Sequence, residues 1–188
     1  MSPQTGHVLV TGGAGYIGSH VALALLARGW RVTIADDLST GSRRLAPAAA
    51  ALHVGDVGDP TFLDPLLAAD RPDAVIHFAG SISVPESVAN PLKYYGNNFA
   101  VSCRLVQSCL KAGVGKLIFS STAAVYGMPE QLPVSEQAPL QPMNPYGQSK
   151  LMTEIMLRDV AAAEHFRYVA LRYFNVAGAD PRLRTGQS

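Results

Sequence analysis

Charged residues are scarce in this 188-residue sequence: 15% are Asp, Glu, Lys or Arg, and the formal net charge is +1. Without a surplus of basic residues, the chain has no electrostatic basis for binding nucleic acid or an anionic membrane surface. The five histidines have no metal-ligand spacing relative to cysteines or carboxylates. We therefore expect no nucleic-acid partner, no membrane partner and no metal site.

Long apolar runs and cysteines are also missing. The longest strongly apolar stretch, residues 21–27, is far shorter than the roughly 20 residues that a membrane-spanning helix needs. The N-terminal sequence MSPQTGHVLVTGG has no basic start followed by a long apolar region, so we expect no signal peptide and a cytoplasmic protein. Only Cys103 and Cys109 occur, six apart in one predicted helix, where they would not share a face, so no disulfide is expected.

What the sequence does contain is a regular alternation of short apolar runs and longer amphipathic stretches. The predicted strands are residues 7–11, 31–36, 51–54, 74–78, 116–121 and 168–174, and the predicted helices are residues 16–28, 61–69, 91–112 and 145–164. Strands that are apolar on both faces and alternate with helices indicate a covered parallel sheet. We therefore expect one α/β domain over residues 1–188, with a doubly wound, Rossmann-type parallel sheet of six or more strands and helices on both faces.

A glycine-rich sequence, TGGAGYIG, follows the first predicted strand and opens the first predicted helix. Gly12, Gly15 and Gly18 stand three apart, as a tight turn, close approach of the backbone to a pyrophosphate and close helix–strand packing require. Asp36 ends the second predicted strand, where a carboxylate can accept both hydrogen bonds of an adenosine ribose. The pattern predicts a dinucleotide, and Asp36 favours NAD over NADP because a carboxylate repels a 2′-phosphate.

Two neighbouring features leave alternatives open. Arg43 and Arg44 could favour NADP, but two arginines in a loop are more often solvated, so NAD is retained. Asp56 follows the third predicted strand and could accept a hydrogen bond from the adenine amino group, or it could be a loop carboxylate or a helix cap. The proline-rich residues 127–143 are expected to form an ordered wall beside the ligand.

The sequence NPYGQSK, residues 144–150, has the signals of a helix start, with Asn144 at the N-cap and Pro145 at the first helical position. Tyr146 and Lys150 are four residues apart and share one face of this helix, and a cation beside a phenol favours the phenolate. Tyr146 could then act as an acid or base. The alternative is that Tyr146 packs while Lys150 pairs with Glu154 on an exposed face.

Six ordered motifs, VLVTGGAGYIGSH, VIHFAGSISVPESV, PLKYYGNN, SSTAAVYG, NPYGQSKLMTE and LRYFNVAGA, extend over essentially the whole chain. With a strand-end hydroxyl followed by Tyr-x-x-x-Lys, the chain resembles the extended short-chain dehydrogenase/reductase family and, within it, the UDP-glucose 4-epimerases. The resemblance implies an isomerase that inverts C4 of a UDP-hexose (UDP-galactose or UDP-glucose) with NAD, through a 4-keto intermediate.

The resemblance also assigns roles to residues. Thr122, Tyr146 and Lys150 would be catalytic: Tyr146 takes the proton of the 4-hydroxyl, Lys150 lowers the pKa of Tyr146 and holds the nicotinamide ribose, and Thr122 bonds the reacting oxygen. Thr122, Tyr146 and Asn175 would contact the substrate, with Asn175 near its diphosphate. Thr122 has the alternative of bonding only local backbone. His77 is expected to be a satisfied core histidine. The residues expected to bind NAD are Gly12, Gly15, Tyr16, Ile17, Gly18, Asp36, Asp37, Asp56, Val57, Phe78, Ala79, Gly80, Asn97, Ser120, Tyr146, Lys150 and Tyr173.

Other activities are weighed against this one. Related nucleotide-sugar 4,6-dehydratases carry an Asp-Glu pair after the strand-end threonine, where this chain has Ala123 and Ala124, so dehydration is disfavoured. A C4 epimerase of a UDP-N-acetylhexosamine or UDP-uronic acid stays open. A non-catalytic NAD-binding module is the alternative from another class, which the retained Thr122, Tyr146 and Lys150 argue against. Ile82 departs from the family, since many epimerases have lysine there.

The resemblance finally implies two features of the whole protein. A homodimer is expected to pack through residues 91–112 and 145–164. Recognition of the UDP-sugar belongs in this family largely to a C-terminal domain beyond Asn175, which this chain lacks. The chain is therefore interpreted as the cofactor-binding half of an epimerase, with the catalytic groups present and little or no turnover.

Overall fold

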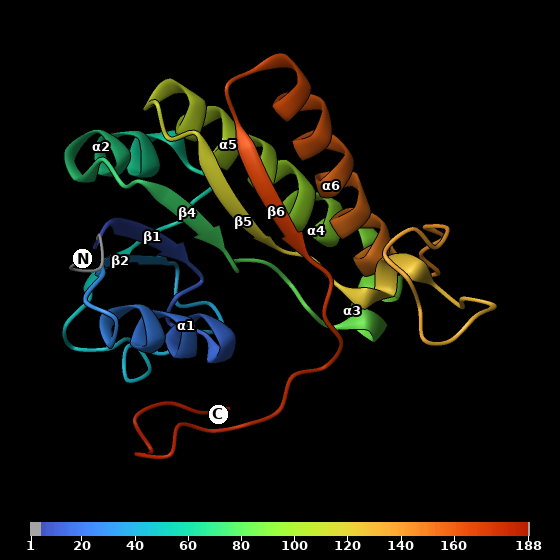
Figure 1. Ribbon diagram of the computed structural model, residues 1–188, viewed down its shortest axis with the longest axis horizontal. Coiled ribbons are helices and arrows are strands. Elements are labelled where there is room, and N and C mark those ends of the chain that lie inside the picture. The colour runs from blue at the N-terminus through green and yellow to red at the C-terminus, as the bar shows by residue number, and fades with distance from the viewer. Residues whose placement is uncertain (1–4, 188) are drawn as a thin grey trace.

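The computed structural model describes residues 5–187 and contains a six-stranded sheet in the order β3-β2-β1-β4-β5-β6, with every neighbouring pair parallel (Figure 1). The strands are β1 His7–Thr11, β2 Arg31–Asp36, β3 Ala51–Val54, β4 Ala74–His77, β5 Lys116–Ser120 and β6 Arg167–Leu171. The strand order reverses between β1 and β4, which opens a crevice at the carboxyl ends of these two strands. The predicted doubly wound sheet is confirmed.

Helices connect most of the strands. The longer ones are α1 Tyr16–Leu26, α2 Pro60–Asp70, α5 Val101–Lys111 and α6 Pro145–Ala163. Shorter ones are α3 Val84–Ala89, α4 Pro91–Tyr94, the π-helix η1 Tyr95–Ala100 and the 3-10 helix η2 Ala123–Tyr126. Asn144 caps α6 by accepting the backbone N–H of Gly147 at 2.9 Å, with Pro145 at the first helical position, so this predicted helix start is confirmed.

The prediction and the structure differ at three elements. The helix expected over residues 91–112 is divided into α4, η1 and α5, because one turn adopts π geometry. The helix α3 was not predicted, although Ser83 caps it by accepting from the backbone N–H of Glu86, three residues on. The last strand ends at Leu171 rather than at residue 174, so residues 172–174 leave the sheet.

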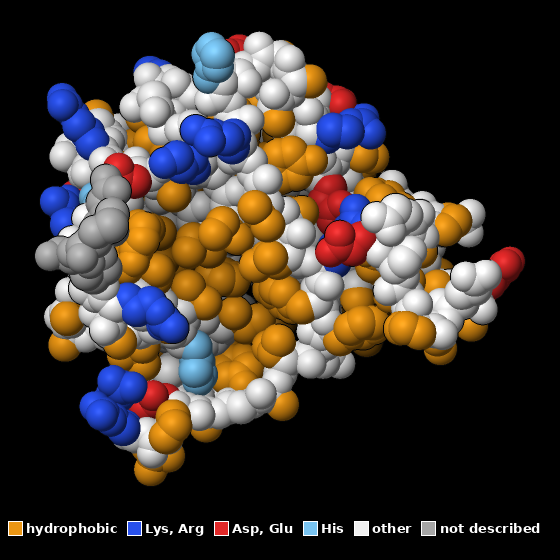
Figure 2. All heavy atoms as spheres, in the orientation of Figure 1, with side chains coloured by type: hydrophobic (Ala, Val, Ile, Leu, Met, Phe, Trp, Pro, Cys, Tyr) orange, Lys and Arg blue, Asp and Glu red, His pale blue; other side chains and the backbone are white. Residues whose placement is uncertain are grey.

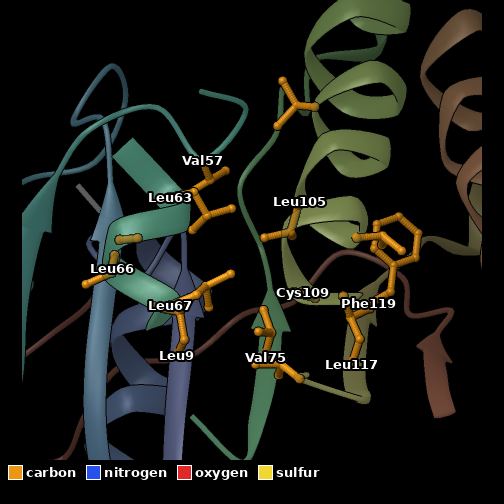
Figure 3. Packing of buried hydrophobic residues seen from close by; sticks show 14 of the residues in the cluster. Leu9, Val57, Leu63, Leu66, Leu67, Val75, Leu105, Cys109, Leu117 and Phe119 are labelled. Atoms are coloured by element: carbon orange, nitrogen blue, oxygen red, sulfur yellow. The ribbon is translucent and has the colours of Figure 1, made fainter. Parts of the chain in front are cut away.

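Strand residues alternate between two hydrophobic clusters, one on each face of the sheet. Leu9 points into the larger cluster, which α2, α5 and α6 cover (Figure 3), whereas Val8 and Val10 point into the smaller one under α1. Cys103 and Cys109 are both free thiols, as expected, and burial raises the pKa of Cys109 to about 12. The site at the carboxyl ends of the strands therefore rests on a packed two-sided core.

The face that α1 covers is only partly shielded. Val169 and Leu171 of β6 project from this face and are 53% and 42% exposed. Figure 2 shows apolar side chains gathered in the middle of this view, where Figure 1 draws β4, β5 and β6. Parallel sheets are ordinarily covered on both faces. Within residues 5–187, the part of this apolar face at β6 therefore lacks the covering element that such a sheet ordinarily has. Over the same residues, no helix combines the length and the apolar character needed to cross a membrane.

Candidate active site

The glycine-rich loop between β1 and α1 is built so that only glycine fits at two positions. Gly12 has a φ of +69°, and a Cβ there would lie 2.6 Å from the backbone nitrogen of Ala79. A Cβ on Gly18 would lie 2.2 Å from the carbonyl oxygen of Gly12. Gly15 is the N-cap of α1 and brings no side chain to the first backbone N–H groups of the helix. Those groups can donate to an anionic ligand such as a diphosphate.

Asp36 stands beside this loop at the end of β2 and is 6% exposed. Its carboxylate accepts backbone hydrogen bonds from Ala14 and Leu38, each at 2.9 Å. The chain after β2 folds back over it, since a Cβ on Gly41 would lie 2.9 Å from Asp36 Oδ1. A carboxylate offers about four acceptor positions, so Asp36 can still accept from ribose hydroxyls. The loop and this carboxylate together fit a dinucleotide.

The neighbouring carboxylates stabilise their own turns. Asp37 accepts from the backbone N–H and the hydroxyl of the serine two residues on, at 2.9 Å and 2.6 Å, and Asp56 accepts from the glycine N–H two residues on at 2.7 Å. Asp59 caps α2, so the helix-cap interpretation of Asp56 is wrong. Asp56 is a loop carboxylate that stabilises its own turn. Val57 is buried in the larger cluster, so only its backbone can face a ligand.

The start of α1 is also contacted from far along the chain. Tyr16 and Ile17 form the first turn of the helix, and the hydroxyl of Tyr16 donates to the carbonyl of Gly178 at 2.6 Å. Ser19 and Thr185 are hydrogen-bonded through their hydroxyls. The segment after β6 therefore runs back past the N-terminus of α1 (Figure 1). Its course brings Gly178 and Thr185 to the first turns of α1.

Tyr146 and Thr122 meet at the carboxyl end of β5. Burial raises the pKa of Tyr146, and a hydrogen bond with the side chain of Thr122 partly offsets that rise. Thr122 also accepts the backbone N–H of Ala124 at 3.1 Å, so its hydroxyl makes the local bond, and its role toward a substrate stays a prediction. A phenol beside a second hydroxyl at the carboxyl ends of the strands can pass a proton to or from a bound alcohol.

Lys150 lies one turn further along α6 and is 4% exposed. Its ammonium donates to the carbonyl of Ser120 at 3.0 Å and lies 5.0 Å from the centre of the Phe119 ring. Burial lowers the pKa of Lys150 to about 8. Burial raises the pKa of Tyr146 and the Lys150 ammonium donates to a carbonyl, so the expected lowering of the Tyr146 pKa by Lys150 stays a prediction.

The alternative in which Lys150 pairs with Glu154 on an exposed face is also wrong. Glu154 is 7% exposed, and its carboxylate binds the guanidinium of Arg172, with Nη2 to Oε2 at 2.6 Å. Both residues therefore lie in the interior, each with a different partner.

The other residues expected to line the site lie at differing distances from Lys150. Gly80 has a φ of +151°, and a Cβ there would lie 3.7 Å from Lys150 Nζ, so the chain after β4 passes directly beside the ammonium. Ser120 and Tyr173 are hydrogen-bonded through their hydroxyls. Phe78 packs against the smaller cluster. Asn175 is exposed, two residues beyond Tyr173, and is not drawn into the buried group.

Two residues at the site escaped the sequence analysis. Asn98 is 2% exposed, and its side chain accepts from the backbone N–H of Ser81 at 2.8 Å and donates to Ser149 Oγ at 3.2 Å. The expected residue, Asn97, is exposed and donates to Ser81 Oγ at 2.9 Å. The π turn shifts the register of the helix, so the second asparagine of the motif points inward. Tyr94, the other missed residue, packs edge-on against the ring of Tyr146 with centroids 6.4 Å apart.

His77 is a satisfied core histidine, as expected. It bonds Thr11 Oγ1 at 2.6 Å and Ser102 Oγ at 3.0 Å, and burial lowers its pKa to about 3, so it is neutral. Among residues 5–187, no group of three or more His, Cys, Asp or Glu side chains is placed to hold a metal ion.

The comparisons with known proteins agree with this geometry. The model of the NAD dependent epimerase/dehydratase family matches residues 8–187. The UDP-glucose 4-epimerase of Azospirillum brasilense is 59% identical over 191 residues, which cover 100% of this chain and 55% of that protein. A crystal structure of the Brucella ovis UDP-glucose 4-epimerase in complex with NAD superposes with a TM-score of 0.95 at 43% identity, over 98% of this chain and 56% of that one.

A second crystal structure, of the Bifidobacterium longum UDP-glucose 4-epimerase with NAD+ and UDP, has a TM-score of 0.92 and 41% identity, over 96% of this chain and 57% of that one. The chain thus spans about half the length of the relatives that it matches. The family model covers nearly all of the chain, and the glycine loop, Asp36 and the Thr122–Tyr146–Lys150 group lie together at one edge of the sheet. The chain belongs to the NAD dependent epimerase/dehydratase family.

Proposed function

We propose that this chain is the cofactor-binding half of a UDP-glucose 4-epimerase, an isomerase that inverts C4 of UDP-galactose or UDP-glucose through a 4-keto intermediate. The observation that carries the proposal is that Thr122 and Tyr146 lie beside each other at the carboxyl end of β5, with the buried Lys150 one turn away. The similarity to UDP-glucose 4-epimerases supports the choice of substrate. When bound, NAD supplies the chemistry of hydride acceptance and return.

The residues of this chain divide the remaining work. Tyr146 takes the proton from the 4-hydroxyl and returns it, and Thr122 orients the reacting oxygen toward it. Because burial raises the pKa of Tyr146, its phenolate needs a further positive charge close by. Lys150 would hold the nicotinamide ribose. Ala123 and Ala124 carry no proton donor, which disfavours dehydration of the sugar.

NAD would be held at both ends of the crevice. Gly12, Gly15 and Gly18 let its diphosphate approach the N-terminus of α1, and Asp36 accepts from the adenosine ribose. The buried carboxylate of Asp36 also selects NAD over NADP, because a 2′-phosphate there would bring two negative charges together. The rest of the expected cofactor residues stay predictions, among them the exposed Asp37, Asp56 and Asn97.

The substrate clamp is proposed to lie in polypeptide that the longer relatives have beyond the matched region. The apolar sheet face over β5 and β6, with the exposed Val169 and Leu171, supports this because it has the character of an interior surface. Asn175 would meet the sugar diphosphate only when that half is in place. Proximity and orientation of a bound substrate can contribute about 7–11 kcal/mol to lowering a barrier, so the chain alone should turn over very slowly.

A homodimer is part of the proposal. A groove between η1, α5 and α6 is lined mainly by apolar side chains, namely Phe99, Leu110, Met152, Ile155, Met156, Val160 and Ala163. Ile155 on its rim is 40% exposed. Two copies facing each other through these helices would bury this surface. The cytoplasmic location stays a prediction of the sequence.

The test is a pair of measurements on the chain as it stands. Calorimetric titration should show NAD binding, and incubation with NAD and UDP-galactose should give little UDP-glucose. Absence of NAD binding would refute the assigned cofactor site. Turnover at the rate of an ordinary full-length epimerase would refute the fragment interpretation. Faster conversion of a UDP-N-acetylhexosamine or a UDP-uronic acid would instead favour the alternative substrates.

A further inference from the structure

A largely buried ion pair joins the ends of β5 and β6 to the middle of α6, beside the proposed catalytic group. Arg172 follows β6, and its Nε donates to both carboxylate oxygens of Glu154, at 3.1 Å and 3.0 Å, while Nη2 donates to Oε2 at 2.6 Å. The same carboxylate accepts the hydroxyl of Ser121. Arg172 Nη1 donates to the hydroxyl of Tyr126 at 2.9 Å, and the guanidinium lies 5.1 Å from the centre of that ring. These bonds hold the pKa of Arg172 above its ordinary value.

Glu154 continues the helical face that carries the proposed catalytic residues. Tyr146, Lys150 and Glu154 follow one another at four-residue intervals, so the ammonium and the carboxylate are neighbours on α6. That spacing would allow the ammonium and the carboxylate to pair. Here they do not, because Lys150 donates to the carbonyl of Ser120 while Arg172 occupies the carboxylate. Arg172 therefore influences Lys150 without contacting it, through the carboxylate of Glu154.

We propose that Arg172 is a positioning residue of this site: by occupying the Glu154 carboxylate it keeps the Lys150 ammonium free for the site. A second consequence follows from the same bonds. The two serines at the end of β5 are both hydrogen-bonded to α6, one to Lys150 and one to Glu154. That double attachment holds the next residue, Thr122, against Tyr146. The inference rests on the proposed roles of these three catalytic residues.

The other titratable groups around Lys150 are uncharged at neutral pH. His77 on β4 is neutral because burial lowers its pKa to about 3. Tyr146 on α6 and Tyr173 after β6 both have a pKa raised by burial. Glu154 is therefore the group whose release would change the pKa of Lys150. Without the guanidinium, its carboxylate would stabilise the ammonium form.

The experiment is a pH titration of the lysine side chains by NMR, on the 188-residue chain labelled with carbon-13 lysine. The Lys150 signal is assigned by its loss in Lys150→Gln. Burial lowers the pKa of Lys150 to about 8 in the unmutated chain, and Arg172→Gln should raise that pKa by on the order of one unit or more. Arg158→Gln is the matched control, since Arg158 lies on α6 and loses the same charge from an exposed pair with Asp159. It should leave the Lys150 pKa unchanged.

Three further variants keep the inference decidable. Arg172→Lys retains the charge and should leave the Lys150 pKa near its original value. Arg172→Gln combined with Glu154→Gln should also leave it there, because the carboxylate is gone. An unchanged Lys150 pKa in the single variant Arg172→Gln overturns the inference.

If Arg172→Gln fails to fold, Glu154→Gln alone decides. The inference expects no fall in the Lys150 pKa, and a fall of on the order of one unit or more would show that Glu154 already pairs with Lys150. Calorimetric titration of the same samples with NAD tests the proposed function separately, because failure of the unmutated chain to bind NAD bears on the cofactor site and not on the lysine titration.

Discussion

Replacing Gly18 with alanine tests the structural basis of the glycine loop most sharply. The new Cβ would lie 2.2 Å from the carbonyl oxygen of Gly12 and 2.8 Å from the Cα of Gly13. Both are backbone atoms, so neither can move aside by changing a rotamer. The start of α1 and the loop must therefore separate, at the place where the diphosphate is proposed to bind.

The size of the effect can be worked from this clash. Overpacking against a rigid interior costs about 1–3 kcal/mol. For a domain of this size each kcal/mol lowers the Tm by about 2–4 °C, so the Tm should fall by about 2–12 °C. Loss of one charge-assisted hydrogen bond to the diphosphate, worth about 1.5–3 kcal/mol, would weaken NAD binding roughly 10- to 100-fold.

Gly96→Ala is the matched control. Gly96 lies in η1, and a Cβ there would meet nothing within 4 Å. Replacing a helical glycine with alanine in open space stabilises a protein by about 0.4–1 kcal/mol, so this variant should melt at the original temperature or slightly higher. Melting is followed by circular dichroism and binding by calorimetry. If Gly18→Ala and Gly96→Ala melt alike and bind NAD alike, the clash argument and the placement of the diphosphate are both wrong.

Further predictions concern the proposed site and dimer. Asp36→Ala should narrow the preference for NAD over NADP in calorimetric titrations, and equal affinities in the unmutated chain would contradict the assigned role. Tyr146→Phe should abolish any residual turnover while NAD binding survives, with Tyr168→Phe as the control that keeps both. The pKa of Lys150 is about 8 in the folded chain, below the ordinary lysine value of 10.5, so the unfolded state binds more protons between these two values, and stability rises with pH there. Denaturant melts should therefore show the unmutated chain gaining on Lys150→Met from pH 8 to 10.5, and a constant difference would refute the buried charge. Met156→Glu should convert the dimer to a monomer in light scattering, and a monomeric unmutated chain at micromolar concentration would count against the groove.

Local signals in the sequence were enough to place the crevice. Gly12 and Gly18 avoid backbone clashes that any side chain would cause, and these clashes involve neighbours close in the sequence or on the adjacent strand. Asn144 and Pro145 mark the start of α6 by their own chemistry. Short apolar runs likewise predicted all six strands, because the parallel sheet buries both faces of most of them.

The sequence could not give the partners of the buried polar groups. Lys150 and Glu154 are correctly spaced to pair, and only the arrival of Arg172 from β6, 18 residues beyond Glu154, decides that they do not. The rise that burial causes in the pKa of Tyr146 could not be predicted either, because burial is set by the packed site and not by the four-residue spacing. The π turn at η1 has no sequence signal that we can identify, and it determines which of Asn97 and Asn98 points inward.

The central claim is that Tyr146 belongs to the site that would hold NAD, and the pKa of this phenol with and without NAD tests it most directly. Ultraviolet difference titration of the unmutated chain against Tyr146→Phe isolates the phenolate of this one residue. Without NAD, burial should keep the pKa of Tyr146 above its ordinary value of 10.0. With saturating NAD, the nearby positive charge should lower that pKa by on the order of one unit or more. The same pKa in the presence and absence of saturating NAD would contradict the account.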